Sequence, residues 1–577
     1  MKNGADAVYF GTTLFNARMM AKNFTRDEAA RAIAYCHERG VLCHVTMNTA
    51  VTDRSMSDAL RQAEFLYQSG ADALIVADLG LAGEIRKNFP DLALHASTQC
   101  GGHSLEGARF FKERGFCRMV AARELDRENL SFLCRNAPLE IEVFVHGALC
   151  VSQSGQCLFS SFLGGRSGNR GECAQPCRMR YNGRYPLSLK DLCLAGHIEE
   201  LLSMGAASLK IEGRMKNPAY VGRVTAVYRR LLDEGRNAAP EEMAYLSEIF
   251  SRSGFTDGYF TKQTGPAMLG VRRREDIENS RAAARTLPLA SHEQRGAKRA
   301  EPAGKANGKT DGQSGPASGR RRDAVPPYER SRSLSPSKAP VSGRKERPVD
   351  SARFYRPETI PEPKLLQNHG IEIVYLPLDR FDGRKANGVL LPPVVFDSEM
   401  PALREKLQKA REEGAVHALV GNAGLIAPAK EAGFCLHGDW RLNICSSYTA
   451  ALFDGLFDDL LLSPELILPQ IRDIRFPKGV VVYGRQPLMT LERPTGTASL
   501  TDRTQAVFPL LSEGGREILL NSVPTYMADK KEALAKCGPL ARHFLFTLEG
   551  KREVESILDA YKKGLPAKKE VRRIRPS

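Results

Sequence analysis

Short apolar runs alternate with amphipathic segments over residues 1–220 of the chain. The runs are short and rich in Ala, Val, Ile and Leu, which is typical of buried strands. Segments between the runs, such as 26–40 and 53–70, place apolar residues at helical spacing and end in Gly, a common helix terminator. The predicted strands are 7–11, 42–48, 73–78, 93–98, 118–122, 141–147 and 208–213.

This alternation predicts an α/β fold built from parallel βαβ units, most economically a TIM-like (β/α)8 barrel over residues 1–270. The opening MKNGADAV reads as the end of a first helix that runs into the second strand of such a barrel. We therefore expect the barrel to be amino-terminally truncated.

Residues 360–565 repeat the pattern of residues 1–270. FCLHGDWRLNICS (434–446) is similar to LALHASTQCGGHS (92–104), and GVVVYGRQPLMTLERP (479–494) is similar to EVFVHGALCVSQSGQC (142–157). Matching residues keep a nearly constant offset, 341 from Glu124 to Glu465 and 342 from His95 to His437. We expect a second, degenerate α/β module here, with a structural or substrate-positioning role.

The region between the two modules has a different composition. Residues 291–350 carry 14 Lys or Arg against 7 Asp or Glu and supply +7 of the net charge of +16. Because they contain few large apolar side chains, we expect a disordered basic linker over 285–355. A second basic stretch forms the tail, 566–577. Two readings stay open: solubilising spacers, or loose electrostatic arms for RNA.

Four of the 13 cysteines are grouped in one segment, at Cys150, Cys157, Cys173 and Cys177. The chain opens without the apolar core of a signal peptide and has no run of about 18 apolar residues, so we expect a cytoplasmic protein without a membrane segment. In a reducing compartment clustered thiols favour metal binding or catalysis over disulfides. Only Cys173 and Cys177 have zinc-knuckle spacing, and the wider gaps fit an iron–sulfur cluster better. The alternative is four small buried apolar residues.

Polar residues recur where the predicted strands end, which is where (β/α) barrels hold their active sites. The glycine-rich stretch 164–171 adds two guanidinium groups that suit a carboxylate or a phosphate. For any one of these residues the alternative is a hydrogen-bonded polar group at the barrel mouth. The candidate catalytic residues are His44, His95, Gln99, Glu142, His146 and Glu212. The candidate substrate-binding residues are Arg18, Asn48, Arg166, Arg170, Lys210 and Arg214.

The block from Glu142 to Arg178 carries a family resemblance. EVFVHGALCVSQSGQCLFSS, GGRSGNRGECAQPCR and the later SLKIEGRMKNPAYV resemble the signature of the collagenase-like peptidase family U 32. GADAVYFG and LHASTQ are similar to its amino-terminal blocks. The resemblance spans about residues 1–270, with a weaker match in 360–565.

The resemblance implies an enzyme. One branch of the family hydroxylates a cytidine of 23S ribosomal RNA without oxygen, another modifies a tRNA wobble uridine, and a third acts on the ubiquinone ring. The RNA branches use prephenate, which implies prephenate as a co-substrate here. Four-iron four-sulfur clusters bound by cysteines occur in the family, which implies the four grouped cysteines as ligands. In its layout the chain is most similar to the long ribosomal RNA branch.

Three functions are therefore in view. The first is an iron–sulfur RNA hydroxylase, with ribosomal or transfer RNA as partner and an unidentified electron or cluster donor. The second is a peptidase, although the sequence has no HExxH or GxSxG and offers only Cys150 and His146 as a Cys–His pair. The third is a non-catalytic RNA-binding factor that uses the basic linker.

Overall fold

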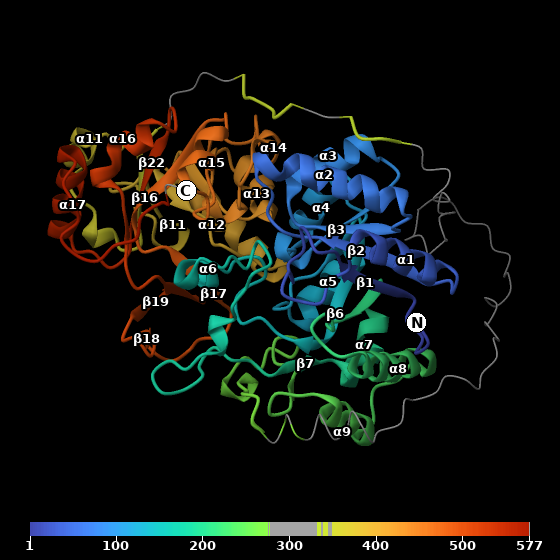
Figure 1. The fold of residues 1–577 in the computed structure, drawn as a ribbon. Helices are drawn as coiled ribbons and strands as arrows, with labels where there is room; N and C mark the ends of the chain where they lie inside the picture. Colours follow the sequence, from blue (N-terminus) through green and yellow to red (C-terminus); the bar gives the residue numbers. More distant parts are fainter. Residues whose placement is uncertain (275, 277, 279–331, 336–337, 344–348, 576–577) are drawn as a thin grey trace, which may run out of the picture.

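The computed structural model describes residues 1–274, 276, 278, 332–335, 338–343 and 349–575. The chain forms two (β/α) units that lie side by side, coloured blue to green and yellow to red in Figure 1. We refer to residues 1–270 as the first unit and to residues 351–575 as the second unit. Most of the predicted linker, 285–355, lies outside the described residues.

The first unit contains seven parallel strands in the order β1-β2-β3-β4-β5-β6-β8. Strand β3 is buried at every residue, as expected for a strand covered on both faces. All seven predicted strands are confirmed. A short strand, β7, pairs antiparallel with β6, and β9 pairs parallel with β7. The bounds are β1 Ala7–Gly11, β2 Leu42–Met47, β3 Ala73–Val76, β4 Ala93–Ala96, β5 Arg118–Val120, β6 Glu140–Ala148, β7 Asp191–Cys193, β8 Ser208–Ile211 and β9 Phe255–Thr256.

The helices of the first unit lie outside this sheet (Figure 1). Helix α1 begins at a capping box in which Thr25 and Glu28 satisfy each other's backbone N–H groups. The chain leaves α1, α2 and α4 at Gly40, Gly70 and Gly115, which all have positive φ. The bounds are α1 Arg26–His37, α2 Asp53–Gln68, α3 Leu79–Asn88, α4 Leu105–Glu113, α5 Arg127–Asn136, α6 Phe159–Gly164, α7 Ile198–Ser203, α8 Pro218–Glu234 and α9 Pro240–Ile249.

The second unit contains a closed ring of eight parallel strands, in which β22 pairs with both β16 and β10. A separate four-stranded sheet, β17-β20-β19-β18, is inserted after β16. The strand bounds are β10 Ser351–Phe354, β11 Ile373–Pro377, β12 Gly388–Leu390, β13 His417–Val420, β14 Cys435–Gly438, β15 Asp459–Leu461, β16 Lys478–Gly484, β17 Pro487–Leu491, β18 Ser499–Thr501, β19 Val507–Glu513, β20 Arg516–Leu520, β21 Thr525–Tyr526 and β22 Ala541–Phe546. The helix bounds are α11 Pro363–Asn368, α12 Met400–Glu412, α13 Ile426–Glu431, α14 Ser447–Ala451, α15 Leu468–Asp473, α16 Lys531–Ala535 and α17 Lys551–Lys563.

The two units share the TIM-like (β/α) fold, which confirms the predicted fold class. They differ at one strand position, because β10 lies between β22 and β11 in the second unit. At the matching place of the first unit, between β8 and β1, the described residues form no strand, and the Tyr9 hydroxyl donates to the Ile211 carbonyl at 3.3 Å. The closed ring therefore belongs to the second unit, which the sequence predicted as the degenerate one. Within the described ranges every helix is too short or too polar to span a bilayer.

Two boundary predictions need correction. Residues 351–354 of the predicted linker form β10, and their side chains are buried in the second unit. The tail also packs against the fold, since the Arg572 amide donates to the Pro524 carbonyl at 2.9 Å and its guanidinium lies 3.6 Å from the centre of the Phe162 ring. The basic composition of these regions therefore did not indicate that residues 351–354 form a core strand, or that Arg572 packs against the fold.

The two units pack through matching elements. Helix α3 contacts α14, which is the counterpart of α4, and α4 contacts the short helix Ala423–Leu425, which begins the counterpart of α3. The Thr449 hydroxyl donates to Asp78 at 3.1 Å across this surface. The units are therefore related by an approximate two-fold, like two subunits of a symmetric dimer.

Candidate functional site

The cysteine segment follows β6 and lies between the two units. Glu124 fixes it from the first unit, accepting hydrogen bonds from the Ser154 amide at 2.8 Å and the Ser154 hydroxyl at 3.0 Å. His103 holds that carboxylate in turn at 2.6 Å. Burial raises the pKa of Glu124, but the hydrogen bond and charge of His103, together with the hydrogen bond from the Ser154 amide, leave this pKa lowered.

The second unit holds the same segment from the other side, where β17 lies beside α6 (Figure 1). The Gln153 amide donates to the Thr490 carbonyl and the Leu158 amide donates to the Leu488 carbonyl, both at 2.8 Å. Glu465, the counterpart of Glu124, accepts from the Asn169 amide group at 2.8 Å. The two related glutamates thus brace one cysteine segment.

A cavity of about 170 Å³ opens at the carboxyl ends of the first unit's strands. All four grouped cysteines line it, together with six of the predicted polar residues. The structure therefore brings ten of the sixteen predicted site residues to one place. They are Arg18, Asn48, Gln99, Cys150, Cys157, Cys173, Cys177, Lys210, Glu212 and Arg214.

Glu212 is the acidic centre of the cavity. The guanidinium groups of Arg18 and Arg123 each lie 3.9 Å from its carboxylate. Burial raises the pKa of Glu212, but Arg18, Arg123 and Arg214 together lower it below its usual range. Glu212 in turn raises the pKa of Arg18. The cavity thus holds one carboxylate among an excess of cations.

Lys210 connects the cavity to a layer of polar side chains inside the barrel. Its ammonium lies 2.6 Å from Glu142, which also lies 3.4 Å from Arg118. The rings of His44 and His95 meet edge to face beside this group, with centroids 4.7 Å apart. Burial lowers the pKa of His44 to about 4 and lowers that of His95 well below its usual value. The predicted residues Glu142, His44 and His95 therefore lie below the cavity, inside the barrel.

His146 points away from the cavity. The register of β6 against β8 shifts between Phe144 and His146, so the two side chains no longer share a face. Phe144 lines the cavity, whereas the His146 ring packs against α8, where its Nδ1 lies 3.3 Å from the Tyr228 hydroxyl. Burial lowers the pKa of His146 to about 3. The structure therefore places His146 outside the cavity that ten of the predicted residues line.

The two arginines of the glycine-rich stretch also lie outside the cavity lining. Arg166 is exposed, and its Nε donates to the Glu172 carbonyl at 3.1 Å. Arg170 lies toward the second unit, where its positive charge acts on Cys445. Burial raises the pKa of Cys445 to about 12, and Arg170 opposes that shift.

Sequence reasoning missed several cavity residues. Tyr9 and Phe144 occupy inward positions of β1 and β6, and Arg123 follows β5, so the strand alternation itself could have indicated them. Burial and then Glu212 raise the pKa of Tyr9 well above its usual value. Met489 comes from β17 of the second unit and had no signal in residues 1–270.

The four grouped cysteines are free thiols. Burial, followed by repulsion from Cys150 and Cys173, raises the pKa of Cys157 well above its usual value, and burial raises that of Cys177 to about 12. All four cysteines line the same cavity. Within the described ranges, however, no three His, Cys, Asp or Glu side chains converge closely enough to hold one metal ion.

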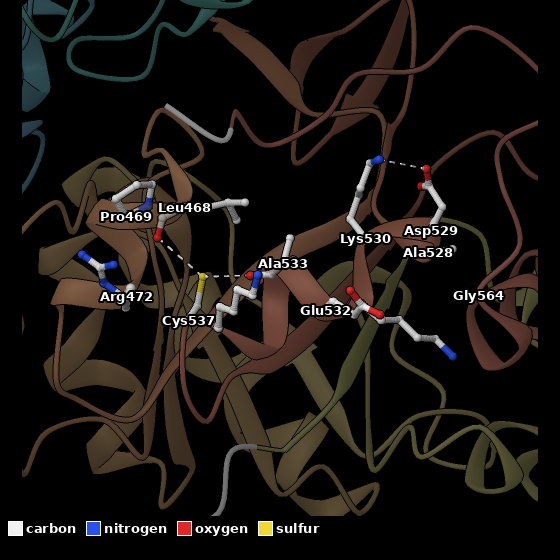
Figure 2. A pocket seen from close by; sticks show the side chains of 12 residues that line it. Leu468, Pro469, Arg472, Ala528, Asp529, Lys530, Glu532, Ala533, Cys537 and Gly564 are labelled. Atoms are coloured by element: carbon white, nitrogen blue, oxygen red, sulfur yellow. Dashed lines mark hydrogen bonds and ion pairs between the residues drawn. The ribbon is translucent and has the colours of Figure 1, made fainter.

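A second hollow, of about 560 Å³, lies between α15 and α16 of the second unit (Figure 2). It contains no predicted site residue. Figure 2 shows Cys537 pointing toward Leu468 and Ala533, and its thiol donates to their carbonyls at 3.5 and 3.6 Å. Cys537 is therefore a packing residue, and the candidate site remains the cysteine cavity.

Several known proteins are similar to this chain. The 23S rRNA 5-hydroxycytidine C2501 synthase of Escherichia coli (strain K12) is 40% identical over 273 residues, covering 45% of this chain and 40% of that protein. An uncharacterized protease of Methanocaldococcus jannaschii is 37% identical over 285 residues, covering 44% of this chain and 68% of that protein. The tRNA hydroxylation protein P of Escherichia coli (strain K12) is 28% identical over 321 residues, covering 45% of this chain and 71% of that protein.

The chain thus spans about 40% of the length of the ribosomal RNA synthase that it matches. The model of peptidase family U32 matches residues 1–269, which include all four grouped cysteines and every cavity residue except Met489. Together with 37% identity across 68% of the Methanocaldococcus protein, this match shows that the chain belongs to peptidase family U32.

Proposed function

We propose that the chain hydroxylates RNA in the cytoplasm with a four-iron four-sulfur cluster bound by Cys150, Cys157, Cys173 and Cys177. The observation that carries this proposal is that four thiols and an excess of cations line one cavity. The cationic side chains are Arg18, Arg123, Lys210 and Arg214. Relatives named for rRNA and tRNA hydroxylation supply the substrate class.

The donor set fits a cluster better than a single zinc ion. Zinc holds its sulfur ligands at about 2.3 Å, which requires four converging thiolates. The described side chains form no such convergent group. A polynuclear cluster takes one cysteine at each iron, so its ligands lie further apart. Burial raises the pKa of Cys157 and Cys177, so binding of a cluster would have to displace the protons of these thiols.

When bound, such a cluster supplies one-electron transfer or polarises a substrate atom. The chain's own residues then bind and orient the other reactants. Arg18, Arg123 and Arg214 suit an anionic co-substrate, and we propose prephenate for this role. Glu212 is ionised at neutral pH because its pKa is lowered, so it can accept a proton from a bound hydroxyl group. Lys210 and Glu142 close the base of the cavity with a buried ion pair.

A peptidase mechanism finds no support in the geometry. A cysteine peptidase needs an imidazole beside its nucleophile. His146, the residue that could serve Cys150, faces α8 and the Tyr228 hydroxyl instead. His44 and His95 do not line the cysteine cavity.

Two measurements test the proposal. Anaerobically purified protein should contain about four irons per chain, and Cys173→Ser should remove the iron and the activity together. Cys445→Ala, in a buried thiol of the second unit, is the matched control and should keep both. Activity is scored by mass spectrometry of rRNA and tRNA nucleosides from a deletion strain carrying each variant. Stoichiometric zinc without iron after anaerobic reconstitution would overturn the cluster, and unchanged nucleosides in the deletion strain would overturn the activity.

A further inference from the structure

Four exposed methionines lie on the loops that border the cysteine cavity. The exposed fractions are 38% for Met19, 67% for Met20, 38% for Met179 and 54% for Met215. Every methionine among the exposed large apolar side chains of the described part of the chain belongs to this set. Met19 and Met215 directly follow the cavity residues Arg18 and Arg214, and Met179 follows Cys177 by two positions. We call these four residues the methionine rim.

The loops that carry the methionine rim are tied to one another. The Met19 amide donates to the Gly171 carbonyl at 3.1 Å, which joins loop 12–24 to the cysteine loop 164–180. Arg214 joins the same loop to residues 213–217, because its Nη2 donates to Asn16 at 2.7 Å and to Asn23 at 2.9 Å. The three loops are therefore held together beside the cavity, which their residues Arg18, Cys177 and Arg214 line.

The same three loops are strongly basic. Residues 12–24, 164–180 and 213–217 contain eight Lys or Arg and a single acid, Glu172. Lys22, Arg166 and Arg180 are exposed on them. An exposed apolar surface beside exposed cations is typical of a binding surface for a ligand with flat apolar faces and negative charge.

Single-stranded RNA has this combination of properties. Its unstacked bases offer apolar faces, and its backbone carries one negative charge per nucleotide. Methionine is unbranched and polarisable, so it adapts to bases of different shape. Duplex RNA hides its base faces, and a peptide carries no regular negative charge.

We propose that the methionine rim is the docking surface for single-stranded RNA. The bases that flank the target pack on Met19, Met20, Met179 and Met215, while their phosphates pair with Lys22, Arg166 and Arg180. The target base then enters the cavity out of its stack. The identity of that target rests on the proposed function, whereas the docking itself is a binding event that can be measured without catalysis.

The test is RNA binding by the full chain, measured as fluorescence anisotropy with a single strand of about 12 nucleotides, within the usual site size, and with the matching duplex. The variant pair Met20→Gln with Met215→Gln should weaken single-strand binding roughly 10-fold, the loss expected for one stacked base. Duplex binding and the dependence on salt should stay unchanged. Lys22→Gln with Arg180→Gln should instead flatten the salt dependence. Leu548→Gln, 41% exposed on the second unit, is the matched control.

Two outcomes overturn the inference: single-strand affinity equal to that of the wild type in the methionine variants, or an equal loss of duplex affinity in those variants. The result also separates the inference from the proposed function. Suppose that the methionine variants bind single-stranded RNA more weakly, while the wild type contains no iron and hydroxylates no nucleoside. This result supports the rim and overturns the function. Normal binding by the methionine variants, with iron and hydroxylation present in the wild type, overturns the rim and leaves the function standing.

Discussion

A buried ion pair closes the base of the candidate site. Lys210 and Glu142 are 6% and 3% exposed and lie 2.6 Å apart. Burial raises the pKa of Glu142, but Lys210 and Arg118 together lower it. Such a pair adds little net stability, yet each partner is costly to bury alone.

Lys210→Met should therefore destabilise the fold by about 3–5 kcal/mol, the usual cost of leaving one buried charge unpaired. Arg118 lies further from the carboxylate and compensates only in part. The double variant Lys210→Met with Glu142→Gln should recover most of this loss. Urea denaturation of the three proteins checks the prediction, and equal losses in the single and double variants would contradict it.

His44 predicts how stability depends on pH. Its folded pKa of about 4 lies below the value of about 6.5 for an unfolded histidine. Between these values the unfolded chain binds more protons, so stability is lost as the pH falls from 6.5 to 4. His44→Gln should flatten this part of the pH profile of unfolding. A profile as steep as that of the wild type would show that His44 does not titrate in this way.

At the residue scale, the sequence predicted ten residues that line the cavity, but it did not predict which face of β6 carries His146. Polar residues after strands were found because parallel strands end at one edge of the barrel. His146 was misplaced because a β-bulge after Phe144 reverses the alternation, and no local pattern announces a bulge. The matching register shift between Val481 and Tyr483 shows that the bulge belongs to the repeated fold.

At the element scale, β17 of the second unit packs against the cysteine segment of the first and places Met489 in the cavity lining. Pro487 and Pro494 occupy the positions that match Cys150 and Cys157, so the second unit keeps this stretch of backbone without its thiols. Local alternation predicted the strands of the first unit well. It could not predict that β17 pairs with residues 152–158, because that contact joins segments from the two different units, which lie far apart along the chain.

Met489 tests this packing. It is 1% exposed and lines the cavity beside the cysteines. Met489→Gln should admit water and speed alkylation of the half-buried Cys157 in the metal-free chain several-fold, whereas Met489→Leu should not. Met527→Gln is the control, since Met527 is equally buried in the second unit but does not line the cavity. Equal alkylation rates in the Met489→Gln and Met527→Gln variants would mean that β17 does not shield Cys157.

At the scale of the whole molecule, the two units form an internal pseudo-dimer. The related acids Glu124 and Glu465 both hold the cysteine segment. Helix α3 contacts the counterpart of α4, and α4 contacts the counterpart of α3. Only one of the two units contributes thiols to the cavity, so the symmetry of the scaffold is not a symmetry of function. The second unit is thereby a part of the site's support, in line with the structural role predicted for it.

The close approach of α3 to α14 makes this dependence measurable. A Cβ atom at Gly80 would lie 2.5 Å from the Thr449 backbone nitrogen, whereas one at Gly83 on the same helix would meet only Leu452, at 3.6 Å. Gly80→Ala should therefore push the units apart and destabilise their contact by about 1–3 kcal/mol, the usual cost of overpacking. Gly83→Ala should be neutral or slightly stabilising, because alanine favours the helix. Calorimetry should then show separate unfolding of the two units in Gly80→Ala only, and the half-buried Cys157 should be alkylated faster in that variant. Identical melting curves for both variants would show that the units do not depend on this contact.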